Sequence, residues 1–275
     1  MWFKNRTKLF RKRAVHRFKI FCNYWFKKRT EKEPVFVIAL RRTGSNLLLS
    51  YLNSIPNASF AGEILNKSMS YGLRQRFISK KTVLKHIAYS IQHRQHRLCG
   101  AKFVKIHLET HRIGLLDLKS IFPALRFIIL YRKSIFDQFV SLKIAQVTNT
   151  WQWTSQFKLP LSLRISPKEF QEYCVNTKMF YTKLLKEEWL KSCSVVLSYE
   201  DLAGDVQALF NESVFPFLKF SPTPIQSDMV KQNTKDPREF IENYEEIEPY
   251  LSHPLAWQEY SGERVPVLEP ALHVA

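Results

Sequence analysis

The stretch Pro34–Asn66, PVFVIALRRTGSNLLLSYLNSIPNASFAGEILN, decides the fold of this 275-residue chain. Pro34–Leu40 is a continuous apolar run rich in β-branched and aromatic residues, which is typical of a central parallel strand buried on both faces. After the polar turn Arg41–Ser45, apolar residues recur at helical spacing over Asn46–Ser54. A strand, a small-residue turn and a helix start direct free N–H groups and a positive dipole at one point. The stretch therefore predicts an anion site, although an ordinary strand-to-helix turn has the same pattern.

The turn differs from the P-loop of nucleotide triphosphatases. That loop reads G-x-x-x-x-G-K-[ST], with a lysine for the β- and γ-phosphates and a hydroxyl for magnesium. Here Gly44 is followed by Ser45 and Asn46, and Arg42 precedes it. The missing lysine disfavours an ATPase or a kinase.

The segment resembles the 5′-phosphosulfate loop of sulfotransferases that use 3′-phosphoadenylyl sulfate (PAPS), especially the bacterial carbohydrate and nodulation-factor type. That group carries a strand, P-R-[TS]-G-[TS], a helix, H/I-P-N and then G-E. The matching residues here are Arg42–Ser45, Ile55–Asn57 and Gly62–Asn66. Arg41 stands where the family has proline, a departure that changes the turn more than the chemistry.

The resemblance implies a donor and the residues that hold it. PAPS would supply the sulfuryl group, and no metal ion is expected, because fixed cations suffice for a group less charged than a phosphoryl group. Arg42 would neutralise charge at the phosphosulfate bridge. The donor-binding residues implied in this loop are Arg41, Arg42, Thr43, Gly44, Ser45, Asn46 and Leu47.

A second strand-to-helix junction supports this interpretation. Leu125–Tyr131 is another buried-strand run, followed by a basic pair and an amphipathic helix. Sulfotransferases place an arginine at the end of such a strand and a serine on the next helix, both on the 3′-phosphate. Arg132 with Ser141 matches the bacterial spacing and Lys133 with Ser141 the cytosolic one, so either cation is a candidate. A phosphate dianion favours charge-assisted donors, which arginine supplies as a bidentate fork.

Two later segments extend the resemblance, which covers Pro34–Ile247. Val195–Leu202 resembles the family's S/Y-Y-E-D-L pattern, which implies that Tyr199 lies near the nucleotide. Lys231–Tyr244 resembles a late segment that closes over the 3′-phosphate and the adenine. The donor-binding residues implied there are Lys231, Gln232 and Asn233.

The acceptor hydroxyl needs a base, and two residues are candidates. Glu63 is the first choice, because it lies where the bacterial relatives place their proposed catalytic glutamate; burial would raise its pKa and Arg42 would lower it. His107 is the alternative, because Lys105–Leu108 resembles the K-T-H-L of cytosolic sulfotransferases, and imidazole suits the role near neutral pH. Lys105 is expected to contact the sulfuryl group in either case.

Composition predicts one domain with an appendage. With 45% hydrophobic residues the chain can bury one substantial core, and we expect a domain over residues 34–275 after a basic arm over residues 1–33. Strand-like and helical runs alternate, which predicts an α/β fold: a P-loop-like parallel sheet flanked by helices, with ligand at the carboxyl ends of the strands. Further elements are expected as strands near Ala58–Phe60, Ala101–Ile106 and Val195–Ser198, helical stretches within Ser70–Arg94, a long helix over Pro167–Cys193, a loop over the site at Thr148–Leu163 and an irregular tail at His253–Ala275.

The arm carries most of the charge. Of the formal net charge of +18, Met1–Glu33 contributes twelve lysines and arginines against two glutamates. Apolar residues recur among these cations at steps of three and four: Phe10, Ala14, Phe18, Phe21 and Trp25. This composition is typical of an interfacial membrane helix, and its longest apolar stretch, Ile20–Phe26, is too short to span a bilayer. We expect a helical arm on an anionic membrane surface; the alternatives are a solvated extension and a helix docked on the domain.

The compartment and partners follow from the same features. The four cysteines are far apart without a C-x-x-C pair, which suits a reducing compartment, and the chain has no signal-peptide pattern. We therefore expect a cytoplasmic protein, peripheral on the inner face of a membrane, that does not bind nucleic acid.

Together these features predict a sulfotransferase that moves the sulfuryl group from PAPS to a hydroxyl of a carbohydrate or glycolipid. A kinase-like phosphotransferase is disfavoured by the missing lysine. The remaining alternative is a non-enzymatic basic protein with a degenerate sulfotransferase fold that binds membrane surfaces or polyanions. Intact Arg42, Arg132 and Glu63 argue against it.

Overall fold

The computed structural model describes residues 32–66, 79–92, 94, 96–151, 162–229 and 236–251. The predicted arm, except for Lys32 and Glu33, lies outside these ranges, and so do the predicted donor ligands Lys231, Gln232 and Asn233. The tail predicted at His253–Ala275 lies outside them as well. Among the described helices, none is long and apolar enough to cross a bilayer.

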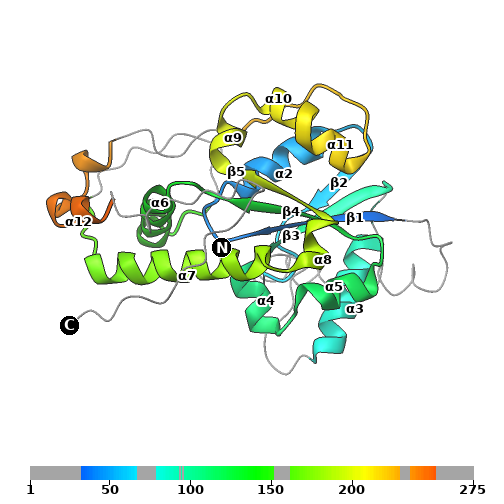
Figure 1. Ribbon diagram of the computed structural model, residues 1–275, viewed down its shortest axis with the longest axis horizontal. Helices are drawn as coiled ribbons and strands as arrows, with labels where there is room; N and C mark the ends of the chain where they lie inside the picture. Colours follow the sequence, from blue (N-terminus) through cyan, green and yellow to red (C-terminus); the bar gives the residue numbers. More distant parts are fainter. Residues whose placement is uncertain are drawn as a thin grey trace, which may run out of the picture.

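Five parallel strands form one sheet in the order β2-β3-β1-β4-β5 (Figure 1). The strands are β1 Glu33–Ala39, β2 Ala58–Ala61, β3 Leu98–Val104, β4 Arg126–Tyr131 and β5 Ser194–Ser198. The central strand β1 pairs with β3 on one side and β4 on the other, and its last six residues are buried. The predicted parallel sheet flanked by helices is confirmed. The loops after β1, β3 and β4 meet at one edge, where the chain passes from one side of β1 to the other, and this is where α/β folds bind ligands.

Helices cover both faces of the sheet. Their bounds are α2 Ser45–Ser54, α3 Lys80–Gln92, α4 Lys105–His111, α5 Leu115–Ile121, α6 Ile135–Thr148, α7 Pro167–Leu185, α8 Glu188–Lys191, α9 Tyr199–Ala203, α10 Val206–Leu209, α11 Phe215–Leu218 and α12 Tyr244–Leu251, with a π-helical turn η1 Phe210–Val214 and a 3-10 turn η2 Pro237–Glu239. In Figure 1, α2 and α9–α11 lie on one face and α3, α4, α5 and α8 on the other.

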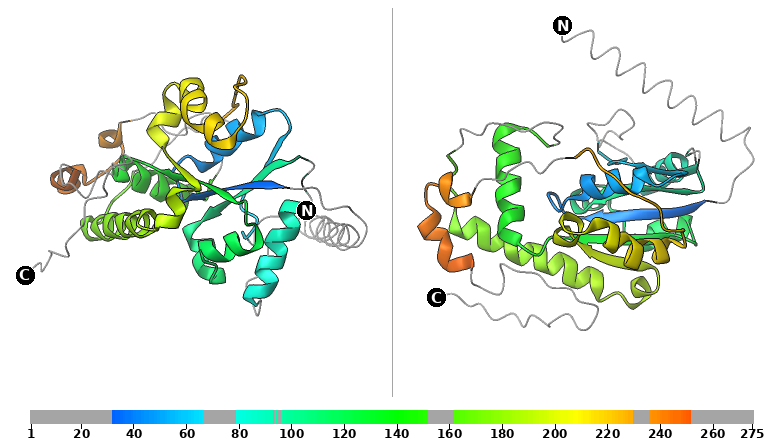
Figure 2. Two further views of the ribbon diagram at one scale, coloured as in Figure 1. Left: turned by 45° about the vertical axis from the view of Figure 1, so that its right-hand side comes forward. Right: turned by 90° about the horizontal axis from the view of Figure 1, so that it is seen from above.

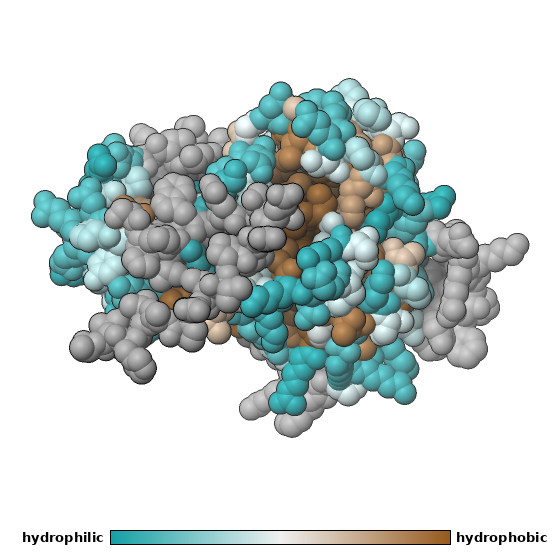
Figure 3. Space-filling view, in the orientation of Figure 1, coloured by the Kyte–Doolittle hydropathy of each residue, from teal (hydrophilic) through white to brown (hydrophobic). Residues whose placement is uncertain are grey.

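Side chains of β1 alternate between two cores, as the two-residue period of a strand requires. Phe36 and Ile38 pack with α3, α5 and the second half of α7, while Val35 and Val37 pack with α2 and α11. A hollow between the two helix layers shows apolar side chains (Figure 3), over the edge strand β5, whose first three residues are only partly buried. The continuous apolar run of β1 is therefore explained by its central place in the sheet, where both of its faces are covered.

A third core lies beyond one end of the sheet. Helices α6 and α12 and the first half of α7 form it (Figure 2). Phe139, Phe170 and Ile247 are buried inside this core. Helix α7 connects this core to the sheet through Tyr181, whose hydroxyl accepts a hydrogen bond from Leu40 N–H at 3.2 Å and donates one to the Leu130 carbonyl at 2.8 Å. The third core therefore lies at the carboxyl ends of β1 and β4.

Two element predictions were wrong in their bounds. The strand expected at Ala101–Ile106 is β3, Leu98–Val104, because its pairing with β1 starts at Leu98 opposite Glu33, and α4 begins at Lys105. The long helix expected over Pro167–Cys193 ends at Leu185, and Glu187, with ψ of 100°, separates it from α8. The apolar period continues through the break because Leu190 of α8 packs on the same core as Leu184.

Candidate functional site

The turn between β1 and α2 is built from left-handed backbone. Arg42 has φ of 65° and Gly44 has φ of 78°. A Cβ atom on Gly44 would lie 2.4 Å from the Tyr199 ring, so this position requires glycine on both conformational and steric grounds. The Thr43 hydroxyl is buried and donates to the Leu40 carbonyl at 3.0 Å, which closes the turn. The first-turn N–H groups of α2 have no partner within the helix, so they point toward this edge of the sheet.

Arg42 is held by neutral groups. Its Nε donates to the Ser141 hydroxyl at 2.9 Å, and its Nη1 donates to the Trp151 carbonyl at 3.0 Å. Burial, and then the nearby charge of Arg132, lower the pKa of Arg42 to about 10, while Tyr199 opposes this shift. The guanidinium therefore stays charged at neutral pH in surroundings that do not compensate its charge.

Arg132 follows β4 and faces the same turn. Its guanidinium carbon lies 4.5 Å from the centroid of the Tyr199 ring, the same ring that covers Gly44. Glu200 lies 3.9 Å from its Nε, and Asp137 lies 3.5 Å from its Nη2. The end of β4 and the start of α9 thus place a second guanidinium beside Arg42.

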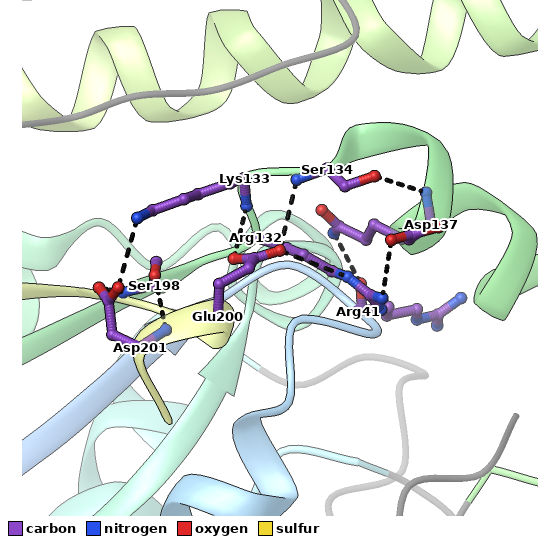
Figure 4. Close-up of polar contacts among 9 residues, drawn as sticks. Arg41, Arg132, Lys133, Ser134, Asp137, Ser198, Glu200 and Asp201 are labelled. Atoms are coloured by element: carbon purple, nitrogen blue, oxygen red, sulfur yellow. Dashed lines mark hydrogen bonds and ion pairs between the residues drawn. The ribbon is translucent and has the colours of Figure 1, made fainter. Parts of the chain in front are cut away.

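Lys133 lies in a different direction from Arg132. Its ammonium pairs with Asp201 at 3.3 Å, and its backbone N–H donates to Glu200 at 2.9 Å (Figure 4). Although burial lowers the pKa of Lys133, the hydrogen bond and charge of Asp201 outweigh burial and raise it. The structure therefore brings Arg132, and not the Lys133 ammonium, to the Gly44 turn.

Glu63 lies across the same edge, after β2. Its carboxylate contacts the Lys102 ammonium at 2.9 Å and accepts a hydrogen bond from Asn66 at 2.7 Å. Lys102 is only 3% exposed and also donates to Asn46 Oδ1 at 2.5 Å, so it connects Glu63 with the first turn of α2. Burial opposes ionisation of Glu63, but Lys102, Asn66 and His107 outweigh it and lower the pKa of this carboxyl.

The two remaining predicted residues lie on α4. His107 Nε2 lies 3.7 Å from Glu63 Oε2, and burial lowers the pKa of His107, so the ring is neutral near pH 7. Lys105 lies against Phe180 at 5.6 Å and pairs with Glu109 at 3.7 Å. The lysine beside Glu63 is therefore Lys102, and contact of Lys105 with a sulfuryl group stays a prediction.

Three buried polar atoms around this edge have no hydrogen-bond partner among the described residues: His107 Nδ1, Arg132 Nε and Gln138 Oε1. Unsatisfied buried polar atoms are uncommon and concentrate where a structure is built for something other than stability. Within the described part of the chain, no three of His, Cys, Asp and Glu are grouped closely enough to hold a metal ion.

Sequence reasoning missed three residues of the site. Lys102 was overlooked, although a lysine inside the apolar strand run Leu98–Val104 is itself a signal, because a buried lysine needs a partner. Gln138 donates to the Arg41 carbonyl at 2.8 Å and fixes the start of the turn. Glu200 accepts from Lys133 N–H and lies beside Arg132, which orders the second junction.

No family model and no curated protein matches the chain. Among solved structures, it is similar to a sulfotransferase from Alicyclobacillus acidocaldarius, with 15% identity and a TM-score of 0.49 over 80% of this chain and 92% of that one. It is also similar to mouse sulfotransferase SULT7A1 complexed with PAP, with 12% identity and a TM-score of 0.42 over 71% of this chain and 61% of that one.

Proposed function

We propose that the protein is a sulfotransferase that moves the sulfuryl group from PAPS to a hydroxyl of a carbohydrate or glycolipid. The observation that carries the proposal is the nearness of two guanidinium groups at the Gly44 turn: Arg132 lies over the Tyr199 ring that contacts Gly44, and its charge acts on the buried Arg42. Two guanidinium groups held close together are stabilised by a polyanion, and the lowered pKa of Arg42 is the sign that its charge lacks compensation.

The donor set fits a nucleotide with two separate phosphate groups. Arg42 and the first-turn N–H groups of α2, Ser45 to Leu47, would hold the 5′-phosphosulfate. Arg132 would hold the 3′-phosphate, and its direction favours it over Lys133. Gly44 allows the turn to lie directly against the Tyr199 ring, which the resemblance places near the nucleotide. Bound there, PAPS would supply an activated sulfuryl group. Ser141 stays a proposed ligand of the 3′-phosphate, and its hydroxyl also accepts from Arg42 Nε, so it would link the two guanidinium sites.

Glu63 is the proposed base. Its carboxylate is 20% exposed and ionised at neutral pH because its pKa is lowered. As the acceptor oxygen bonds to sulfur, its proton passes to Glu63, the bond from sulfur to the bridging phosphate oxygen breaks, and the 3′,5′-bisphosphate leaves with that electron pair. A low pKa weakens the base, so proton transfer has to accompany bond formation. Lys102 contacts both Glu63 and Asn46, and it would supply a further positive charge near the transferring group.

His107 has a supporting position in this proposal. Its Nε2 faces Glu63, and its Nδ1 is buried, so neither nitrogen is directed to the acceptor as openly as the carboxylate. The ring approaches Glu63 Oε2, whereas Lys102 contacts Oε1, so His107 would help to orient the carboxylate.

The test is transfer of labelled sulfate from PAPS to a panel of glycans and glycolipids by the full-length protein. We expect Glu63→Gln to keep affinity for the desulfated nucleotide and to lower turnover by about 100-fold or more. His107→Ala is the matched comparison and should lose less. If His107→Ala abolishes turnover while Glu63→Gln stays active, His107 is the base, and absence of any transfer contradicts the proposed activity.

We also propose that the arm, residues 1–33, binds anionic membrane surfaces, which would bring the enzyme to a lipid-linked acceptor. Its charge and its apolar stripe in the sequence support this. Flotation with liposomes should retain the full chain only when anionic lipid is present and should lose a chain that starts at Lys32. Equal flotation of both chains would contradict it, as would loss of turnover of a soluble acceptor on truncation.

A further inference from the structure

Arg41 and Trp151 form an exposed pair at the edge of the site. The Arg41 guanidinium carbon lies 5.4 Å from the centroid of the Trp151 ring. Arg41 is exposed, and Trp151 is 39% exposed. In the described part of the chain, no carboxylate lies within ion-pair distance of Arg41. The pair therefore presents a flat apolar ring and an unneutralised cation to solvent.

The backbone ties both residues to the site. The Trp151 carbonyl accepts from Arg42 Nη1 at 3.0 Å, and the Arg41 carbonyl accepts from Gln138 Nε2 at 2.8 Å. Figure 4 shows the Arg41 side chain extending away from Glu200 and Lys133. The Arg41 guanidinium is thus directed away from the residues that pair with Lys133.

Arg41 and Trp151 lie beside the guanidinium that we assign to the phosphosulfate. Arg41 precedes Arg42 in the turn, and the Trp151 carbonyl that accepts from Arg42 Nη1 belongs to the residue whose ring lies 5.4 Å from the Arg41 guanidinium carbon. Lys102 contacts both Asn46, in the first turn of α2, and Glu63, so the proposed base belongs to the same edge. An acceptor whose hydroxyl reaches the sulfuryl group beside Arg42 would therefore have its next groups near Arg41 and Trp151.

We propose that Arg41, which the resemblance assigns to the donor, instead forms with Trp151 an acceptor subsite for an acidic sugar, a ring that carries a carboxylate. The inference rests on the proposed sulfotransferase activity and names the acceptor class. The apolar C–H face of a sugar ring packs on an indole, and the planar guanidinium binds a carboxylate through two parallel hydrogen bonds. A neutral sugar would use the indole alone, and an acidic peptide would use the guanidinium alone. The acidic sugar is the class that uses both members of the pair.

The test compares two tetrasaccharides, one of alternating glucuronic acid and N-acetylglucosamine and the same molecule after reduction of its carboxylates to alcohols. Binding to the full-length protein is measured with and without the desulfated nucleotide. We expect the acidic form to bind about 10- to 100-fold more tightly, which is the value of a charge-assisted pair. Arg41→Gln should remove most of this preference, and Trp151→Ala should weaken binding of both forms.

Arg97→Gln is the matched control, because it removes an exposed arginine at the amino end of β3, away from the site. Arg97→Gln should keep the preference for the acidic over the reduced tetrasaccharide. All variants carry the same basic arm, so any binding of the acidic tetrasaccharide to the arm should be equal among them. Equal binding of both tetrasaccharides, or a preference that survives Arg41→Gln, would overturn the subsite. If the protein instead binds acidic peptides more tightly than the acidic tetrasaccharide, and Trp151→Ala does not change this, the ligand class is not an acidic sugar. Tetrasaccharide binding is also measured without the nucleotide. A protein that binds the acidic tetrasaccharide but not the nucleotide would therefore contradict the proposed sulfotransferase activity and leave the subsite in place.

Discussion

The junctions after β1 and after β4 are neighbours in the sheet, and each places two basic residues at a strand end. After β1, Arg42 is held by a serine hydroxyl and a backbone carbonyl. After β4, Arg132 and Lys133 are accompanied by the carboxylates of Asp137, Glu200 and Asp201 (Figure 4). The difference indicates that the first junction keeps its charge for a ligand, while the second is largely neutralised and gives a ligand one oriented guanidinium.

The two junctions also differ in backbone. The first contains Arg42 and Gly44 in the left-handed region, which exposes the N–H groups at the start of α2. The second has an ordinary helix start, where Ser134 accepts from Asp137 N–H at 3.1 Å. A turn that stores conformational cost and directs several backbone donors at one point is expected to bind an anionic group with several oxygen atoms, such as the phosphosulfate.

The largest effect is expected from Arg42→Gln. It removes a guanidinium that we assign to the 5′ end of the nucleotide, so affinity for the desulfated nucleotide should fall by about 100-fold or more, the value of two charge-assisted hydrogen bonds. Because the surroundings of Arg42 do not compensate its charge, the free energy of unfolding should fall little or rise. Calorimetry and thermal unfolding measure the two quantities. If Arg42→Gln keeps the affinity for the desulfated nucleotide and is less stable than the wild type, Arg42 is a structural residue. The first junction would then not differ from the second in keeping a charge for a ligand.

Gly44→Ala should have the next largest effect. The left-handed φ and the 2.4 Å approach of a Cβ atom to Tyr199 predict a loss of about 1–3 kcal/mol in the free energy of unfolding, with weaker nucleotide binding. Gly114→Ala is the control, because its backbone is extended, with φ of −88° and ψ of 164°, and the nearest atom to a Cβ lies at 3.4 Å. Denaturant unfolding of both variants measures the difference. Equal stability of the two would show that the first turn is unstrained.

The sequence predicts β1, β4 and β5 well, because their central residues are apolar, and these strands lie within two residues of their predicted bounds. β3 contains Lys102, and it starts three residues before the predicted Ala101–Ile106, because pairing with β1 fixes its start at Leu98. Strand register depends on the partner, and the sequence of one strand does not contain it.

The same limit applies to the site. Arg42, Arg132 and Glu63 are found from local patterns, since each follows a strand or turn. Lys102 and Glu200 act through partners far along the chain, and spacing alone does not reveal such pairs. The choice between Arg132 and Lys133 was left open by the sequence, because it depends on which of them Asp201 neutralises.

The smallest change is expected with pH. The pKa of Glu63 is lowered from 4.5, so the base stays ionised and kcat/KM should be constant as the pH falls from 8 to 5, with loss only below about 4.5. His107 acting as base would instead give a loss below its ordinary pKa of 6.5, at a pH set by its own lowered pKa. A pH–rate profile of the wild type and of His107→Ala decides between them. A limb between pH 5 and 6.5 that is absent in His107→Ala would contradict the assignment to Glu63.

The central claim, that the two junctions hold the two ends of one nucleotide, is tested most directly by calorimetry with adenosine 3′,5′-bisphosphate and adenosine 5′-monophosphate. The wild type should bind the bisphosphate about 10- to 100-fold more tightly, one charge-assisted contact at the 3′-phosphate. Arg132→Gln should abolish this difference and leave the affinity for the monophosphate unchanged, while Lys133→Gln, which removes a partly exposed pair with Asp201, should keep it. Equal affinity of the wild type for both nucleotides, or a difference that survives in Arg132→Gln, would contradict the account.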